Sequence, residues 1–277
     1  MSAQAGIGET SSYFSRLFRL LLISSAQLVR TPSNPRRAEA ARRLLRDVAL
    51  ATAVLGIAII ALMVAVDVWE IAQMPPRGTA GLWPVRILTD FGKAANVLWS
   101  LAALLLVTAI VIPLIHGGWR SRLMRLGTRL QFLFLAVLVP VLSGEVIKWI
   151  VGRGRPFVGG KANAFNFSHF AGSEAYASFP SAHAITAFAL AFAVSAIWPR
   201  TWIAMSVYAV AIAATRLVLL AHHPSDVVGG ALIGVVGAMC VRYCFAVRRL
   251  GFGIRSDGAI VPLYGDRKGV ARKPSAP

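Results

Sequence analysis

Six long apolar runs constrain this chain more than any other feature of its sequence. Each is nearly free of charge and close in length to a membrane span; the runs cover residues 48–66, 94–115, 130–151, 184–198, 201–220 and 227–245. A bilayer-crossing helix needs about 20 apolar residues, and at these lengths only helices satisfy their backbone hydrogen bonds in lipid. The sequence therefore predicts an all-α, polytopic integral membrane protein, folded as a bundle of six transmembrane helices.

The composition excludes an ordinary soluble domain. The chain has 277 residues, of which 57% are hydrophobic and only 14% are charged, whereas soluble domains carry about 25% charged residues. The two cysteines, Cys240 and Cys244, are too few for a disulfide framework or a four-ligand metal site. We interpret them as helix-packing residues.

Two basic segments flank the predicted membrane domain, which covers residues 47–246. The N-terminal arm, residues 1–46, contains "YFSRLFRLLLISSAQLVR". Arginines follow this stretch, so it favours an amphipathic helix on the membrane surface over a signal-peptide core. Residues 247–277 are rich in glycine, proline and basic residues, and predict a flexible tail.

The net charge of +18 would suggest a nucleic-acid partner in a soluble protein, but its distribution gives another explanation. With six spans, 21 of the 29 lysines and arginines fall on one side, in residues 1–46, 116–129, 198–201 and from Arg242 onward. Positive residues favour the cytoplasm, so both termini are expected there. The charge then reflects topology and attraction to anionic lipids. We expect no nucleic-acid partner, and a bacterial inner-membrane location.

Ionisable and polar groups gather at the opposite, periplasmic helix ends. Seven of them come from four separate stretches: Lys148, Arg155, Ser181, His183, Arg216, His222 and Asp226. A lysine and two arginines can surround a phosphate, and the helix beginning at "PSAH" directs N–H groups towards an anion. Each residue alone has an ordinary explanation, such as snorkelling or, for Glu145, pairing with Lys148. Together on one face they predict a phosphate site.

The histidines predict what this site does with a phosphate. His222, with Asp226 four residues later, has the pattern of a nucleophile or base with an orienting partner. His183, on another helix, can protonate a leaving group. Phosphoryl transfer needs little beyond positioning and charge stabilisation. The adjacent His222 and His223 diverge and have no further ligand set, so no metal is predicted.

The order and spacing of three blocks resemble the signature of the type 2 phosphatidic acid phosphatase (PAP2) family, K-x6-RP, PSGH and SR-x5-H-x3-D, shared with vanadium haloperoxidases. Here the blocks are "KWIVGRGRP" at 148–156, "PSAH" at 180–183 and "TRLVLLAHHPSD" at 215–226. The resemblance covers about residues 90–245. Ala182 replaces the usual glycine and Thr215 the usual serine; neither change removes a catalytic group.

The resemblance implies a role for each matched residue. His222 would attack phosphorus and form a phosphohistidine, Asp226 would hold its imidazole in the correct tautomer, and His183 would serve the leaving group and then the water. The phosphoryl oxygens would be bound by Lys148, Arg155, Ser181, Arg216 and backbone N–H groups near Ala182. No metal or other cofactor is implied. His223 and Arg153 lie outside the signature and are expected to be non-catalytic.

The resulting hypothesis is a metal-independent membrane phosphatase acting on a lipid phosphate or diphosphate at the periplasmic face. Phosphatidic acid, phosphatidylglycerol phosphate, undecaprenyl diphosphate and lipid A are the candidate substrates, and the loop 157–179 is expected to cover the site. The six spans disfavour a soluble vanadate enzyme. Two alternatives stay open, a lipid phosphotransferase using the same residues and a non-catalytic lipid-phosphate-binding or transport protein. The sequence selects neither one substrate nor an oligomeric state.

Overall fold

A computed structural model describes residues 12–76, 78–156, 158–160 and 162–263. The α-helices in this part of the chain are α1 (Tyr13–Val29), α2 (Arg37–Ala65), α3 (Asp67–Gln73), α4 (Trp83–Asp90), α5 (Ala94–Val111), α6 (Gly117–Val151), α7 (Ala182–Ile197), α8 (Trp202–Val218) and α9 (Pro224–Val247). Short 3-10 turns are η1 (Ala80–Leu82), η2 (Ile112–Leu114), η3 (Glu174–Tyr176) and η4 (Pro199–Thr201), and the two strands are β1 (Phe252–Ile254) and β2 (Ile260–Pro262).

The predicted fold class is confirmed, since every predicted span is helical. These spans correspond to α2 and to the five helices from α5 to α9. Among the described residues, five helical segments are long and apolar enough to cross a membrane, and α7, with 16 residues, is shorter. The helix α6 begins at Gly117, well before its apolar run, because the arginines and leucines that precede the run are good helix formers.

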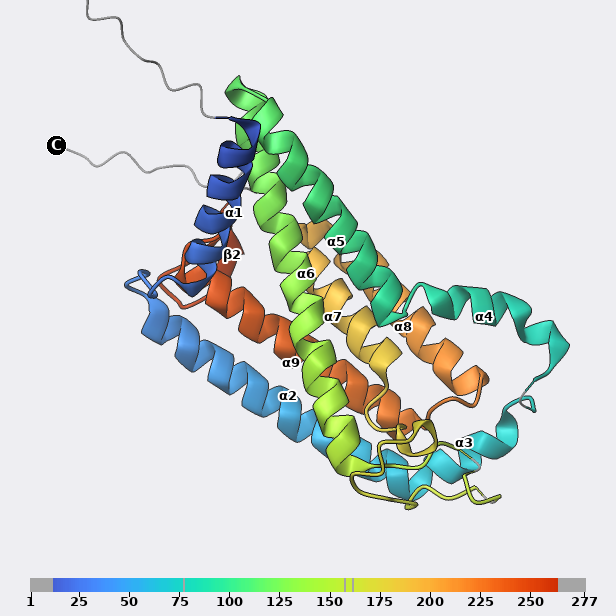
Figure 1. The fold of residues 1–277 in the computed structure, drawn as a ribbon. Helices are drawn as coiled ribbons and strands as arrows, with labels where there is room; N and C mark the ends of the chain where they lie inside the picture. The colour runs from blue at the N-terminus through green and yellow to red at the C-terminus, as the bar shows by residue number, and fades with distance from the viewer. Residues whose placement is uncertain (1–11, 77, 157, 161, 264–277) are drawn as a thin grey trace, which may run out of the picture.

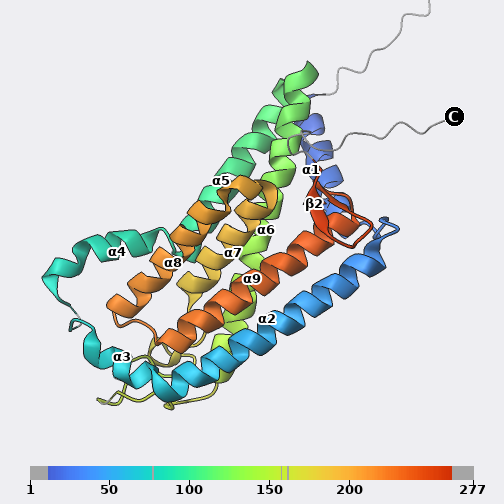
Figure 2. The same cartoon turned by 180° about the vertical axis from the view of Figure 1, so that it is seen from behind.

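Helix α9 lies at the centre of the bundle, against α2, α6 and α7, and α7 lies between α6 and α8 (Figures 1 and 2). The contact between α7 and α9 depends on two glycines. A Cβ on Gly230 would lie 2.6 Å from the backbone oxygen of Ser181, and one on Gly234 would lie 2.5 Å from that of Ile185. Only glycine permits so close a backbone approach. The start of α7 is thereby held against the start of α9.

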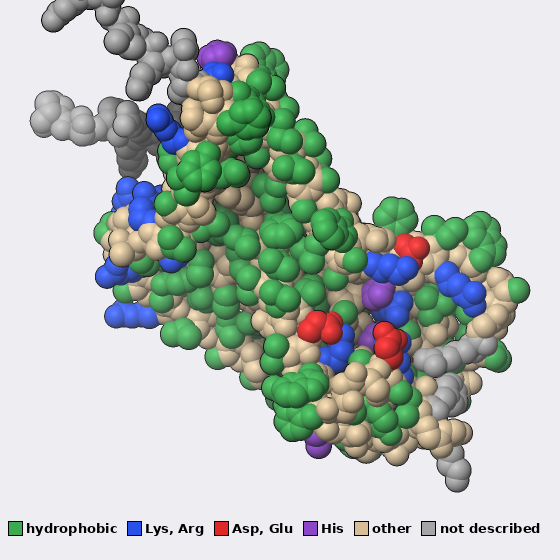
Figure 3. All heavy atoms as spheres, viewed as in Figure 1, with side chains coloured by type: hydrophobic (Ala, Val, Ile, Leu, Met, Phe, Trp, Pro, Cys, Tyr) green, Lys and Arg blue, Asp and Glu red, His purple; other side chains and the backbone are tan. Residues whose placement is uncertain are grey.

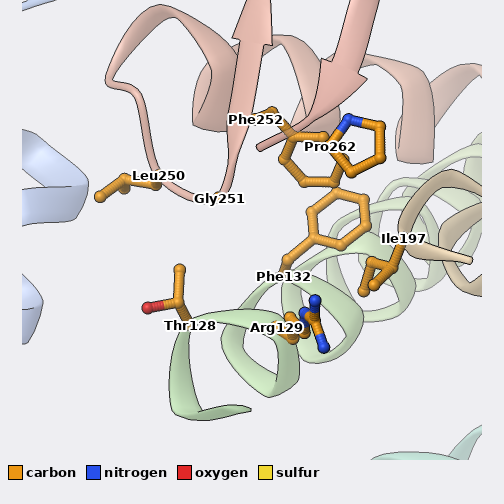
Figure 4. A pocket seen from close by; sticks show the side chains of 8 residues that line it. All are labelled: Thr128, Arg129, Phe132, Ile197, Leu250, Gly251, Phe252 and Pro262. Carbon is orange, nitrogen blue, oxygen red and sulfur yellow. The ribbon is translucent and has the colours of Figure 1, made fainter. Parts of the chain in front are cut away.

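A C-terminal hairpin follows α9, where a flexible tail is predicted from residue 247. Strands β1 and β2 pair antiparallel, and Phe252 and Ile254 are buried. The Phe252 ring packs edge-on against Phe132 of α6, with 4.7 Å between centroids, beside a small pocket between α6 and the hairpin (Figure 4). For residues 252–262 the flexible-tail prediction is therefore wrong, because these apolar side chains extend the core. Residues 264–277 lie outside the described part.

Helix α1 lies against the bundle, near α5 and η2 (Figure 1). The Tyr13 hydroxyl donates to the Ile110 carbonyl at 3.0 Å, and Gln131 donates to the Ser24 hydroxyl at 2.6 Å. Much of the apolar surface of α1, including Phe18, is exposed. That α1 lies at a membrane surface stays a prediction, and residues 1–11 of the predicted arm lie outside the described part.

The segment between the first two spans forms structure that the hydropathy pattern does not predict. Helices α3 and α4 project to one side of the bundle (Figure 1), and α4 packs against α8. The Tyr208 hydroxyl of α8 donates to the Phe91 carbonyl just after α4, at 2.8 Å. This segment brings Asp67 and Thr89, both buried, to the end of the bundle where the polar residues gather.

Candidate active site

All predicted site residues lie at one end of the bundle, far from the described chain ends (Figure 1). Lys148 is in the last turn of α6, Arg155 in the following loop, Ser181 at the N-cap of α7, Ala182 and His183 in its first turn, Arg216 in the last turn of α8, His222 before α9 and Asp226 in its first turn. Figure 3 shows acidic, basic and histidine side chains gathered between the lower end of α6 and α4, on a face that is otherwise largely hydrophobic.

A single glycine turns the chain back at the end of α6. Gly152 has a φ of +55°, and its N–H donates to the Lys148 carbonyl at 2.9 Å. A Cβ here would lie 1.8 Å from the backbone oxygen of Ser168, so both its conformation and the close approach require glycine. The turn places Lys148 and Arg155 on the same cavity.

This cavity has a volume of about 340 Å³ and is lined by cations, carboxylates and aromatic rings. Lys148 Nζ lies 2.5 Å from Glu145 Oε1, the pairing that their spacing suggests. Arg155 Nη2 lies 3.6 Å from Glu174 Oε2. Both carboxylates are well exposed, so the pairs are weak and can exchange for another anion.

Several buried polar atoms around this end have no hydrogen-bond partner among the described residues. Among them are Arg155 Nε, Ser181 Oγ, His183 Nε2 and Arg216 Nε. Buried polar atoms are normally paired, and a hydroxyl with guanidinium N–H groups suits phosphate oxygens. The first turn of α7 adds backbone N–H groups that lack intrahelical acceptors. The donor set therefore fits a phosphate group.

His222 is buried, and its environment fixes both its tautomer and its charge. Its Nδ1 lies 2.8 Å from the Ser178 carbonyl oxygen, and since a carbonyl only accepts, Nδ1 carries the proton and Nε2 keeps its lone pair. The pKa of His222 is lowered to about 3, chiefly by burial and also by the charges of Arg216 and Arg155, against the opposing effects of Asp226 and the Ser178 carbonyl. The imidazole is therefore neutral near pH 7, as a nucleophile must be.

Asp226 does not hydrogen-bond the His222 ring. Its Oδ2 lies 3.9 Å from His222 Nδ1, beyond hydrogen-bond distance. The same oxygen accepts from Ser178 Oγ at 2.5 Å and from the His223 backbone N–H at 2.9 Å. The expected direct contact is replaced because Asp226 and His223 form a capping box at the start of α9. The Ser178 carbonyl, not the carboxylate, holds the imidazole.

Four contacting residues were not predicted as part of the site. Arg153, expected to be non-catalytic, donates to Asp226 Oδ1 at 2.6 Å. Arg216 Nη1 donates to Thr89 Oγ1 at 2.7 Å. Asp67, a carboxylate at the end of the first apolar run, pairs with Arg153, and Ser178 contacts both His222 and Asp226. Of these four residues, only Asp67 has a signal in the sequence, because an acidic residue at the end of a membrane span suggests a functional role.

Comparison with known proteins adds an independent observation. Residues 129–250 match the model of the PAP2 superfamily, a stretch that includes every predicted site residue. A lipid A 1-phosphatase of Rhizobium johnstonii is 33% identical over 127 residues, which are 46% of this chain and 52% of that protein. A putative undecaprenyl-diphosphatase, YbjG, of Escherichia coli is 35% identical over 115 residues, 39% of this chain and 54% of that protein.

A more distant relative covers more of the chain. The bacitracin transport permease protein BcrC of Bacillus licheniformis is 26% identical over 163 residues, 56% of this chain and 76% of that protein. The chain spans about half the length of the two phosphatase relatives. No solved structure matches it significantly.

Proposed function

Residues 129–250 belong to the PAP2 superfamily, and from this premise we propose that the chain is a membrane lipid phosphate or diphosphate phosphatase. One observation carries the proposal: buried, unpartnered donors from three elements surround the same end of the bundle as a neutral, buried His222. A protein that only bound phosphate would need the donors but no oriented nucleophile.

In the first step, the lone pair on His222 Nε2 attacks phosphorus. A P–N bond forms, the P–O bond to the leaving group breaks, and His183, which enters this step as the imidazolium, gives a proton to the leaving oxygen and becomes neutral. Lys148, Arg155, Ser181, Arg216 and the N–H groups near Ala182 bind the phosphoryl oxygens as charge redistributes. These donors are in place before the reaction, so they stabilise the transition state without reorganising.

In the second step, water attacks the phosphohistidine. The P–N bond breaks, His183 takes a proton from the water, and inorganic phosphate leaves. His222 then returns to its neutral state, with Nδ1–H still directed at the Ser178 carbonyl. The cationic donors can neutralise the phosphate without a metal ion. Activity should therefore persist in excess chelator, and the test includes it for this reason.

Lipid substrates are supported by the position of the site at the end of an apolar helix bundle, where a headgroup can enter while its chains stay in the bilayer. The relatives named for lipid A and for undecaprenyl diphosphate point to those two lipids first. We place the site at the periplasmic face of a bacterial inner membrane, with both termini cytoplasmic, on the distribution of lysine and arginine.

The test is phosphate release by the purified full chain in detergent with excess chelator. The panel contains lipid A, undecaprenyl diphosphate, phosphatidic acid and phosphatidylglycerol phosphate. The controls are His222→Ala and His116→Ala, the second at an exposed histidine at the other end of α6. Release that His222→Ala abolishes and His116→Ala retains supports the proposal. Equal release by the two variants would refute the phosphohistidine mechanism.

A folded protein that releases no phosphate is then tested with added acceptor lipids. Transfer of labelled phosphate to an acceptor would replace hydrolase by phosphotransferase. Binding of the lipid without turnover or transfer would make the chain a binding protein.

A further inference from the structure

A fully buried arginine behind the nucleophile has no role in the mechanism above. Arg153 is 1% exposed, and each of its five N–H donors has an acceptor. Its Nη1 donates to Ser225 Oγ and Asp226 Oδ1, both at 2.6 Å. Its Nη2 donates to Asp67 Oδ2 at 2.7 Å and to the Ala164 carbonyl at 2.8 Å, and Nε donates to that carbonyl at 3.1 Å. This arginine is immobilised in a single orientation.

Asp67 joins α3 to the same cluster. Its Oδ1 accepts from the Ser225 backbone N–H at 3.1 Å, and its Oδ2 accepts from the Ser225 hydroxyl at 2.5 Å. Asp67 therefore fixes both the guanidinium and the first turn of α9. It comes from outside residues 129–250, so the part of the chain that matches the family does not itself complete this cluster.

Ser178 connects the cluster to the nucleophile. Its N–H donates to the Arg153 carbonyl at 3.0 Å, and its hydroxyl donates to Asp226 Oδ2 at 2.5 Å. Its own carbonyl accepts from His222 Nδ1 at 2.8 Å. A continuous row of buried contacts thus runs from Asp67 through Arg153, Asp226 and Ser178 to the ring of His222.

The charges along this row suit a histidine that becomes a phosphoimidazolium. Two carboxylates and one guanidinium leave the row with a net negative charge, which opposes the effect of Arg216 and Arg155 on the His222 ring. When Nε2 bonds to phosphorus, the ring gains positive charge, which this negative charge stabilises. Burying three charges is costly and is tolerated only with full hydrogen bonding, as found here. Apolar side chains could fill the same space without this cost, so packing alone does not explain the buried charges.

We propose that Asp67, Arg153 and Ser178 are positioning residues, which hold Asp226 and direct the His222 ring so that Nε2 faces the phosphate. The proposal rests on the proposed function for its kinetic readout. These residues do not touch the substrate, so their loss lowers kcat and leaves KM nearly unchanged.

The decisive variants are Ser178→Ala and Asp67→Asn. Ser178→Ala keeps the carbonyl that binds His222 and cuts only the link to Asp226, and as a small, neutral change it also guards against misfolding. Asp67→Asn keeps the shape and removes the charge. The matched controls are Ser143→Ala, whose hydroxyl bonds within α6, and Asp47→Asn, in a partly exposed ion pair of α2.

The expected result for both test variants is a fall in kcat on the order of 10- to 100-fold, by analogy with the range found when a metal-ligating histidine loses its outer hydrogen-bond partner. KM should stay within about twofold, and the controls should match wild type. A kcat within about twofold of wild type in either test variant, or a loss seen only as a raised KM, would overturn the proposal.

A second readout does not depend on turnover. In protein labelled with ¹⁵N-histidine, the signal that His222→Ala removes should show a protonated Nδ1 and an unprotonated Nε2 at pH 7. Asp67→Asn should shift or broaden that signal, while Asp47→Asn should not. A ring protonated at Nε2, or an unchanged signal in Asp67→Asn, would overturn the positioning role. An inactive wild type with the expected spectrum would refute the proposed function alone.

Discussion

The side chains of Arg216 and Thr89 are hydrogen-bonded, with 2.7 Å between Nη1 and Oγ1. The Thr215 hydroxyl contacts the same threonine oxygen at 3.0 Å. Through this contact α4, a short helix at the side of the bundle, orients Arg216 of α8, one of the arginines that we propose bind the phosphate. The hydroxyl of Thr215, where the family signature has serine, therefore supports Arg216.

Thr89→Val should weaken phosphate binding. The variant keeps the side-chain shape but removes the acceptor of Arg216, and a lost hydrogen bond to a charged group costs about 1.5–3 kcal/mol. We expect KM to rise by about one order of magnitude, with a smaller change in kcat. Thr79→Val, at an exposed threonine of the same segment, should leave both constants unchanged. Unchanged kinetics in Thr89→Val would show that Arg216 needs no support from α4.

Glu145→Gln should lower KM. Glu145 pairs with Lys148, so under the proposed function it competes with the substrate phosphate, and its neutralisation should free the ammonium group. Because Glu145 is half-exposed, the change should be about two- to fivefold, as for other surface pairs. Inhibition by inorganic phosphate provides the measurement, and Glu39→Gln, at an exposed site on α2, is the control. A raised inhibition constant in Glu145→Gln would mean that Glu145 orients Lys148 instead of competing for it.

His222 should destabilise the fold in acid. Its pKa is about 3 in the fold and about 6.5 when unfolded, so between these values the unfolded chain binds more protons. Stability should therefore fall as the pH decreases from 6.5. His222→Gln should flatten this slope in thermal unfolding, whereas His116→Gln should not. A wild-type slope that persists in His222→Gln would place the titrating group elsewhere.

Glu70 should have the opposite effect. Its carboxylate is buried without a hydrogen-bond partner among the described residues, and burial, with the charge of Asp67, raises its pKa to about 7. Between pH 4.5 and 7 the folded protein therefore binds more protons than the unfolded chain, so stability falls as the pH rises. Glu70→Gln should unfold at a higher temperature than wild type at pH 8 and at a similar one at pH 4.5. A lower unfolding temperature at pH 8 would indicate a charged, paired Glu70.

The spans and the signature residues could be predicted because their signals are local. Apolar runs report helices directly, and the spacing from Lys148 to Arg155 or from His222 to Asp226 is set by one turn or helix start. Basic segments alternate along the chain, and this alternation was sufficient to predict that the seven polar residues lie at the same end of the bundle. The hairpin at 252–262 was mispredicted because glycine, proline and basic residues are frequent over the whole stretch 247–277, while two apolar side chains within it, Phe252 and Ile254, decide its packing.

The supporting residues could not be predicted in the same way. Ser178 acts on His222 through a backbone carbonyl, which every residue possesses, so no side chain signals it. Thr89 reaches its partner from 127 positions away. Arg153 stands two residues before the signature arginine, and nothing in the spacing shows that it points into the core while Arg155 lines the cavity.

Because Asp67 comes from α3, residues 129–250, which match the family model, lack part of this cluster when taken alone. A fragment cut to residues 129–250 would leave Arg153 without one of its carboxylates and Arg216 without its threonine. A fragment that keeps both contacts must therefore start upstream of residue 67. In a chimera with a relative, α2 to α4 would have to be exchanged together with the region that they complete.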